Sequence, residues 1–295
     1  MYSLLGGSLR VERLTVPIRN LPPALAGLQI AQLSDLHFDG LRLSERLLHQ
    51  AIAATNAAKP DLVVLTGDYV TDEPDPIYGL ADHLRSLQSR LGTYAILGNH
   101  DLLYARSQPM ITKALGDVDI RVLWDEVIYP FGEDLALVGL RDYWSPRFNP
   151  APVMQQIPAE MPRIVLSHNP DSAKSLQRWR VDLQLSGHTH GGQVIIPGVG
   201  PIVMEMKKLR QQLSKPMQRW VKHLTQGCDK VVQHWEWAHG LHQVQDNWLY
   251  VNRGLGTYLP GRLFCPPEVT LITLVRCHPY SGNRYQAEVA VSISR

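Results

Sequence analysis

From residue 28 onward, short apolar runs alternate with stretches in which apolar residues recur every three or four positions. The short runs have the length of buried strands, whereas the longer periodicity is typical of helices with one buried face. The predicted strands cover residues 29–33, 62–65, 94–97, 135–140, 164–166 and 181–185. Strands that alternate with helices predict a sheet with helices packed against its faces.

The clearest predicted helix covers residues 43–58. Residues at helical spacing form one stripe on it, and Ser44 is suited to cap its N-terminus. The stripe consists of Leu47, Leu48, Ala51, Ile52 and Thr55. Similar patterns predict helices over residues 78–91 and 171–179.

The C-terminal part of the chain has a different pattern. Residues 248–252, 269–275 and 286–293 are predicted strands with no helix between them. Because successive parallel strands need a long crossover connection, this part of the chain favours a mixed sheet over a purely parallel one.

Residues 197–246, here called the basic insert, interrupt the alternation, and no strand is predicted within them. Between residues 201 and 226 the chain carries six basic residues and one acidic residue, Glu205. An apolar stripe runs through this segment at Leu209, Leu213, Met217, Trp220 and Leu224. Pro216 is expected to kink this helix or to begin a second one.

The composition limits the classes of protein to which this chain can belong. The chain has 295 residues, of which 44% are hydrophobic, enough for one large α/β domain or two small ones, and we expect a single domain over residues 1–295. The net charge of +2 indicates no general attraction to nucleic acid. Three widely spaced cysteines cannot form a disulfide framework. Without a signal-peptide pattern or a bilayer-spanning apolar run, we expect a cytoplasmic protein whose membrane contact, if any, is peripheral.

Five short polar motifs begin one or two residues after the last residue of a predicted strand. They are Asp35-Leu36-His37, Gly67-Asp68, Gly98-Asn99-His100-Asp101, Ser167-His168-Asn169 and Gly187-His188-Thr189-His190. One such motif alone is weak evidence, because Asp and Gly are common turn residues and most histidines are structural. Ligands in open α/β sheets bind beyond the carboxyl ends of strands, so five motifs at strand ends together indicate a functional site.

The residue types in these motifs indicate a pair of metal ions. Asp35 and His37 are separated by one residue and project to the same side of a strand end, and His188 and His190 repeat this arrangement. The two oxygens of the Asp68 carboxylate are suited to bridge two cations. Nitrogen and oxygen ligands without thiolate favour Mn, Fe, Zn or Co. Two such cations can share a bridging hydroxide that attacks phosphorus, and can clamp the phosphate oxygens.

Together the motifs resemble the signature of the calcineurin-like metallophosphoesterases, whose order is DxH, GD, GNH[D/E], H and GHxH. The segments SDLHF, PDLVVLTGDYV, ILGNHD, LSHNPD, SGHTHGGQV and LYVNRGLGT are similar to a bacterial branch of membrane-associated phosphodiesterases that includes UDP-2,3-diacylglucosamine pyrophosphohydrolase-type enzymes. The resemblance covers most of residues 11–276. It implies an α/β fold, a four-layer sandwich of two facing mixed β-sheets flanked by helices.

The resemblance also implies a role for each motif residue. The implied metal ligands are Asp35, His37 and His190 for one ion, and Asn99, His168 and His188 for the other, with Asp68 bridging both. His100 is expected to face the substrate, where it stabilises charge or protonates the leaving oxygen. Asp101 is expected to support catalysis from outside the ligand set by orienting a histidine.

Two subclasses of this superfamily do not fit the chain. Phosphoprotein phosphatases carry an arginine in the motif GDxxDRG, where this chain reads GDYVTDEPD. Purple acid phosphatases place a tyrosine three residues after the bridging aspartate, where this chain has Thr71.

Three features each have two interpretations. The basic insert, with tryptophans at 220, 235 and 237, is either a membrane-surface helix over residues 204–224 that presents lipid substrates, or a solvated amphipathic helix packed on the domain. Arg253 is either a phosphate contact or part of a surface salt bridge. Trp144 either lines the cleft or is a core aromatic.

We therefore predict a hydrolase of phosphodiester or pyrophosphate bonds that depends on two divalent ions, preferably Mn²⁺, and acts on nucleotide-linked or lipid substrates. The alternatives are a phosphomonoesterase or a nucleotide or nucleic-acid phosphodiesterase with the same centre. A non-catalytic scaffold of the same fold is disfavoured, because no ligand position is missing. The expected partners are a phosphate-ester substrate and an anionic membrane surface, and no obligate protein partner is indicated.

Overall fold

Two β-sheets lie face to face in the computed structural model, which describes residues 6–212, 231–277 and 291–293. The first sheet has the strand order β15–β1–β14–β2–β3–β4–β5. Its strands are β1 (Arg10–Arg19), β2 (Gln29–Leu33), β3 (Leu62–Leu65), β4 (Thr93–Ala95), β5 (Ile120–Val122), β14 (Glu268–Cys277) and β15 (Val291–Ile293). The run from β2 to β5 is parallel, whereas β14 is antiparallel to β2, so the sheet is mixed.

The second sheet is also mixed and has the order β12–β13–β9–β8–β7–β6. Its strands are β6 (Glu126–Ile128), β7 (Ala136–Gly139), β8 (Arg163–Leu166), β9 (Leu183–Ser186), β12 (Gly240–Val244) and β13 (Asn247–Val251). Strands β7, β8, β9 and β13 are parallel, and the edge strands β6 and β12 are antiparallel to their neighbours.

Alternating side chains of the strands build separate hydrophobic cores. In β3, Leu62 and Val64 face the second sheet, whereas Val63 and Leu65 face the helices on the outer side. A strand that is buried on both faces reads as a continuous apolar run, which is why β3 was recognisable in the sequence.

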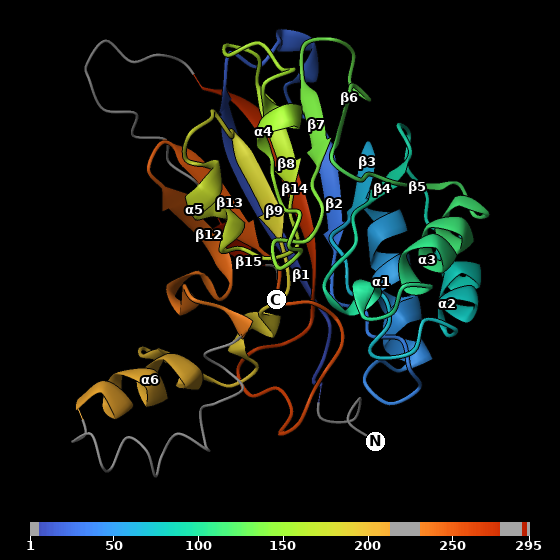
Figure 1. Cartoon of the computed structure of the whole chain (residues 1–295), viewed down its shortest axis with the longest axis vertical. Helices are drawn as coiled ribbons and strands as arrows, with labels where there is room; N and C mark the ends of the chain where they lie inside the picture. The colour runs from blue at the N-terminus through green and yellow to red at the C-terminus, as the bar shows by residue number, and fades with distance from the viewer. Residues whose placement is uncertain (1–5, 213–230, 278–290, 294–295) are drawn as a thin grey trace.

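Helices cover the outer face of each sheet (Figure 1). The first sheet is covered by α1 (Glu45–Ala57), α2 (Ile77–Leu84) and α3 (Ser107–Gly116), and the second by α4 (Ala151–Met154) and α5 (Ser172–Leu176). The order helix, sheet, sheet, helix confirms the predicted sandwich of two facing mixed sheets flanked by helices.

Local sequence predicted the central elements well. Strands β2 and β3 have the predicted bounds, and Ser44 caps α1 by accepting a hydrogen bond from Leu47 N at 3.2 Å. The predicted helix over 78–91 is too long, since α2 ends at Leu84. The chain turns there because Leu91 N must reach Asp61 O, at 2.7 Å, to enter β4 beside β3.

The basic insert differs from its prediction. It contains β12 and also β11 (Gly200–Pro201), which pairs with β10 (Ile195–Ile196), so the expectation of no strand there is wrong. Helix α6 (Ile202–Gln212) is the start of the predicted amphipathic segment and projects from one end of the molecule in Figure 1. Four residues of the predicted stripe, with Pro216 and part of the predicted last strand, lie outside the described residues: Leu213, Met217, Trp220 and Leu224.

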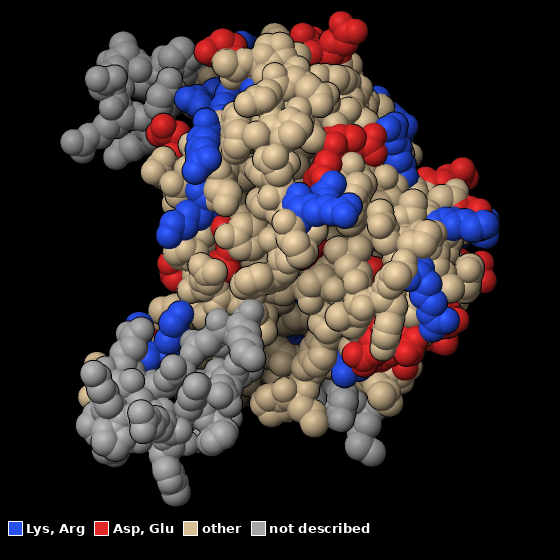
Figure 2. All heavy atoms as spheres, viewed as in Figure 1, with Lys and Arg blue, Asp and Glu red and all other residues tan. Residues whose placement is uncertain are grey.

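The surface charge and the helices of the described residues agree with two predictions from the sequence, the absence of a general basic character and the absence of a bilayer-spanning run. On the face shown in Figure 2, basic and acidic side chains are interspersed over both sheets rather than gathered into one basic area. Within the described ranges, no helix has the length and apolar character needed to span a bilayer.

Candidate metal centre and cleft

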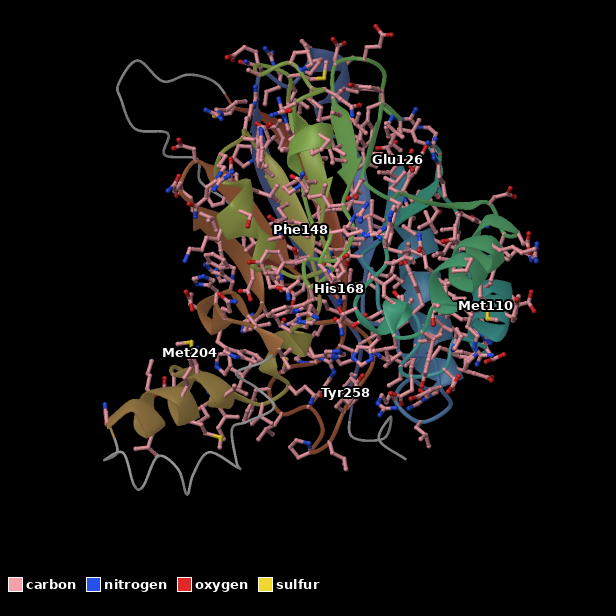
Figure 3. The ribbon with its side chains drawn as sticks, viewed as in Figure 1. Met110, Glu126, Phe148, His168, Met204 and Tyr258 are labelled. Carbon is pink, nitrogen blue, oxygen red and sulfur yellow. The ribbon has the colours of Figure 1, made fainter. Side chains whose placement is uncertain are left out.

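The carboxyl ends of β2, β3, β4, β8 and β9 meet at one end of the two sheets, and the five polar motifs lie there. Figure 3 shows His168 at this end of the central strands and Tyr258 beyond it. Six of the seven predicted ligand residues are buried, and Asn99 is half-buried. The buried six are Asp35, His37, Asp68, His168, His188 and His190.

The loops that carry these residues have an unusual backbone. Asp35, His37, Asp68, His188 and His190 all have positive φ, between 45° and 72°. Non-glycine residues rarely adopt this region, and such strain is found mostly at functional sites. Hydrogen bonds tie the loops together, including His37 N to Asp68 O at 3.0 Å and His188 N to Asp35 Oδ1 at 2.9 Å.

Glycines in the motifs permit this close approach. A Cβ atom on Gly98 would lie 2.2 Å from Asp68 Oδ1, and one on Gly187 would lie 2.2 Å from Asp35 Oδ2. Each distance is far below van der Waals contact, so a larger residue would push the carboxylate out of the site. The glycines of the GN and GH motifs are therefore required by packing.

The buried side chains form two groups. Asp35, His37 and His190 offer ligand atoms within 4.8 Å of one another, and a separate group with the same spacing lies beside them. The second group consists of Asp68, His168 and His188. Asp68 joins the two groups, because its Oδ2 lies 3.1 Å from His168 Nε2 and 3.6 Å from His37 Nε2.

One nitrogen of each histidine ring is held by a hydrogen-bond partner outside these groups. The pairs are His37 Nδ1 with Tyr258 Oη, His100 Nδ1 with Thr71 O, His168 Nδ1 with Thr66 O, His188 Nε2 with Val231 O, and His190 Nδ1 with Gly256 O. A carbonyl oxygen only accepts, so in the four rings that are paired with a carbonyl the ring proton resides on that nitrogen. The other nitrogen of each neutral ring is then left as an acceptor, which is the arrangement of metal-binding histidines.

The donor set fits divalent cations. His37 Nε2 and His190 Nε2 face each other at 3.1 Å, and donation from His190 Nδ1 to Gly256 O leaves His190 Nε2 as an acceptor. Asn99 Oδ1 is buried and accepts no hydrogen bond from the described residues. A buried acceptor without a donor is unfavourable by itself, and a cation bound at each of the two groups would offer these acceptors a partner.

Ionisation in the cluster follows from burial and from the pairing of Asp68 with His168. Burial lowers the pKa of His37 to about 3 and that of His188 to about 4, so both rings are neutral at pH 7. Burial opposes charge on His168, but the charge and hydrogen bond of the Asp68 carboxylate, together with the charges of Asp35 and Asp142, outweigh burial and raise the pKa of His168 to about 10. A cation bound between Asp68 and His168 would displace that proton.

Among the described residues the Asp101 carboxylate bonds to backbone N–H groups and to no histidine ring, so the expectation that it orients a histidine is corrected. Its buried carboxylate accepts hydrogen bonds from the backbone N–H groups of Asp68, Tyr69 and Gly98, at 2.7 to 2.9 Å. Burial raises its pKa to about 7. Asp101 thus joins the loop that carries Asp68 to the loop that carries Asn99.

Arg253 is not part of a surface salt bridge, so that interpretation is wrong, and Arg253 is not among the residues that line the cleft described below. Its guanidinium pairs with Glu12 and Glu268, and the three side chains are only 12%, 9% and 3% exposed. The pairing arises because β1 lies beside β14, which brings Glu12 next to Glu268. Arg253 therefore belongs to the buried frame under the site.

A cleft of about 500 Å³ opens over the two groups. Asp68, Asn99 and His100 line its polar floor, and Trp144, which is 43% exposed, lines one wall, so Trp144 is a cleft residue and not a core aromatic. The remaining wall is mostly apolar, and the sequence analysis did not predict that its residues line a cleft. One signal was present, because Tyr258 directly follows the segment LYVNRGLGT. It includes Gln193, Val203, Val231, Trp235 and Tyr258.

Comparison with known proteins is in accord with this geometry. The model of the family described as "Calcineurin-like phosphoesterase" matches residues 28–192. The chain is 32% identical to the phosphodiesterase YaeI of Escherichia coli over 85% of this chain and 83% of that protein. It is 28% identical to the UDP-2,3-diacylglucosamine pyrophosphatase LpxG of Chlamydia trachomatis over 91% of this chain and 89% of that protein. The chain therefore belongs to the calcineurin-like phosphoesterase family and is a metal-dependent phosphoesterase.

Proposed function

We propose that the chain hydrolyses phosphodiester or pyrophosphate bonds with two divalent cations, preferably Mn²⁺. The observation that carries this proposal is the place of Asp68 Oδ2 between His37 and His168, at the junction of two ligand groups. In this proposal Asp35, His37 and His190 hold one cation, and Asp68 is shared. The ligands of the other cation are Asn99, His168 and His188.

When bound, a pair of divalent cations supplies charge to the phosphate oxygens and makes hydroxide available at neutral pH. The chain itself supplies orientation and proton transfer. His100 lines the cleft, its backbone N donates to Asp68 Oδ1 at 2.9 Å, and its Nδ1 is held by Thr71 O. Its Nε2 is therefore the atom that remains to donate a proton to the leaving oxygen when the ring is protonated.

The cleft supports a substrate with an apolar or ring-shaped portion. Beside the polar floor it offers the two indole side chains of Trp144 and Trp235 and the side chain of Val203. LpxG, one of the relatives, is named for a nucleotide-linked diacyl sugar, and YaeI is named a phosphodiesterase. We therefore favour nucleotide-linked or lipid-linked diesters over small phosphomonoesters.

The proposal includes contact of the basic insert with an anionic membrane surface. Leu209 on α6 is 61% exposed, and Lys207 and Lys208 precede it. This combination of an exposed apolar side chain with basic neighbours is typical of helices that lie on anionic lipid. Flotation with liposomes that contain anionic lipid is expected to recover the protein and to lose the Lys207→Glu, Lys208→Glu variant, whereas equal recovery of both would contradict the contact.

The proposed reaction is tested with an aryl phosphodiester and the matching monoester. Chelator-treated protein is titrated with Mn²⁺, and the rate of aryl alcohol release is measured for both esters. Mn²⁺-dependent turnover that favours the diester is expected. Preference for the monoester would favour a phosphatase, and turnover of neither ester by Mn²⁺-bound protein would favour the scaffold alternative.

A further inference from the structure

The basic insert contributes directly to the candidate metal centre. The five histidines of the motifs have described partners for one ring nitrogen each, and among these partners only Val231 belongs to the insert. Its carbonyl oxygen lies 2.9 Å from His188 Nε2. This contact leaves His188 Nδ1 facing His168 Nε2, at 3.2 Å. The ring orientation of His188 therefore depends on where the insert places residue 231.

A buried carboxylate holds this part of the insert in place. Asp171, which is 1% exposed, accepts hydrogen bonds from Gln233 N at 2.7 Å and from His234 N at 3.0 Å. The Asp171 backbone is itself fixed, because its N–H donates to Asn169 Oδ1 at 2.9 Å. Asp171 thus connects the loop that carries His168 to the two residues that follow Val232.

Further contacts fasten the same segment to its surroundings. The Thr189 hydroxyl donates to Ala238 O at 2.5 Å, directly beside His188 in the chain. Val232, Trp235 and Ala238 are buried together, and Val203 and Met204 of α6 pack against them. Residues 231–238 are therefore packed between α6 and the loop of the GHTH motif.

We propose that residues 231–238 form an outer shell of the metal centre, and that Asp171 is a positioning residue that sets the affinity of the cation site containing His188. This inference rests on the two-cation centre proposed above. An outer-shell partner of a metal-binding histidine typically changes metal affinity by about 10–100-fold when it is lost. Here the partner is a backbone carbonyl, so the side chain that controls it is Asp171.

The test measures cation binding rather than turnover. Mn²⁺ is titrated into the chelator-treated full chain and into the Asp171→Asn variant, and free Mn²⁺ is followed by electron paramagnetic resonance. Asparagine keeps the shape of aspartate but offers one acceptor oxygen for two N–H groups. Hydrogen exchange of the Gln233 and His234 amides reports in parallel whether the segment has been released.

The matched control is Asp61→Asn. Asp61 also accepts a backbone hydrogen bond, from Gln29 N at 2.8 Å, but it precedes β3 and lies at the opposite end of that strand from Asp68. If Asp171→Asn fails to fold, Val232→Ala loosens the same segment without touching a carboxylate.

The expected result is two Mn²⁺ ions in the wild type and the control, with one ion bound about 10–100-fold more weakly in Asp171→Asn and faster exchange at 233–234. Faster exchange with both affinities unchanged would overturn the inference, as would unchanged exchange. A wild type that binds fewer than two Mn²⁺ ions would instead contradict the proposed two-cation centre.

Discussion

Both carboxylate oxygens of Asp68 lie close to neighbouring groups in the cleft. One of its carboxylate oxygens lies between two histidine nitrogens, and the other accepts the backbone N–H of His100. An ionised carboxylate can interact with all of these groups at once, because each of its two oxygens can accept more than one hydrogen bond. Its pKa is well below the usual range: burial opposes ionisation, but the charge and hydrogen bond of His168, together with the charges of the other nearby histidines, outweigh it.

For Asp68→Asn we expect loss of Mn²⁺ binding together with a loss of turnover of at least about 100-fold. The amide offers one neutral oxygen and directs N–H hydrogens toward the ring nitrogens. Mn²⁺ titration and diester hydrolysis are measured on the same preparation. Full occupancy with full activity would show that Asp68 is not a ligand.

For His100→Ala we expect unchanged Mn²⁺ occupancy and turnover that is slower by about 10²–10⁴-fold, because only proton donation is lost. The slowing should shrink for diesters whose leaving alcohol is more acidic, since a better leaving group needs less protonation. An equal loss for all leaving groups would mean that His100 acts by binding the phosphate and not as an acid.

At the scale of the elements, the strands carry the site and buried ion pairs fix the frame beneath it. Arg253 follows β13 and pairs with Glu12 of β1 and Glu268 of β14, so it connects the two sheets. Tyr250 Oη adds a hydrogen bond to Glu268 Oε1 at 2.8 Å. Breaking one partner of a buried network leaves the other charges without compensation.

Arg253→Met is therefore expected to lower the free energy of unfolding by about 3–5 kcal/mol, while KM for the diester stays within about twofold of wild type. The control is Arg121→Met, which removes an exposed pair with Glu126 and should cost less than about 1 kcal/mol. Denaturant unfolding measures the loss of stability, and steady-state kinetics measure whether Arg253 also contributes to substrate binding. A raised KM with unchanged stability would restore Arg253 as a substrate contact.

The sequence predicted helices and strands best where a single local pattern determines the element. Strand β2 and the cap of α1 follow from an apolar run and from one serine hydroxyl. Strand β1 was not predicted, although Leu14, Val16 and Ile18 alternate with less buried positions. Its role is decided by pairing with β14, more than 250 residues away, which local periodicity does not report.

At the scale of the whole molecule, we propose that residues 1–295 form one domain. The first sheet interleaves both ends of the chain, because β14 lies between β1 and β2. Removing either β1 or β14 would expose the apolar faces of the neighbouring strands. In excess chelator, we expect coincident unfolding transitions by fluorescence and circular dichroism, and two separate transitions would contradict a single domain.

Mn²⁺ is expected to raise the midpoint of thermal unfolding, because the two ligand groups converge only in the folded chain. At 100 times the dissociation constant, one bound ion adds about 2.7 kcal/mol of stability. Calorimetry with and without Mn²⁺ measures the shift, and Asp68→Asn serves as the control that should lose it. Equal shifts in both proteins would mean that Mn²⁺ acts elsewhere.

The sequence by itself determined the family, the strands that carry the motifs, and the residue types that a divalent metal requires. These features were accessible because a ligand motif at a strand end is encoded within a few consecutive residues. Only the tertiary structure decided that Arg253 pairs with Glu12, 241 residues away, that Trp144 lines the cleft, and that Val231 holds His188. Those contacts join distant parts of the chain, so they depend on sheet order and register, which no local pattern specifies.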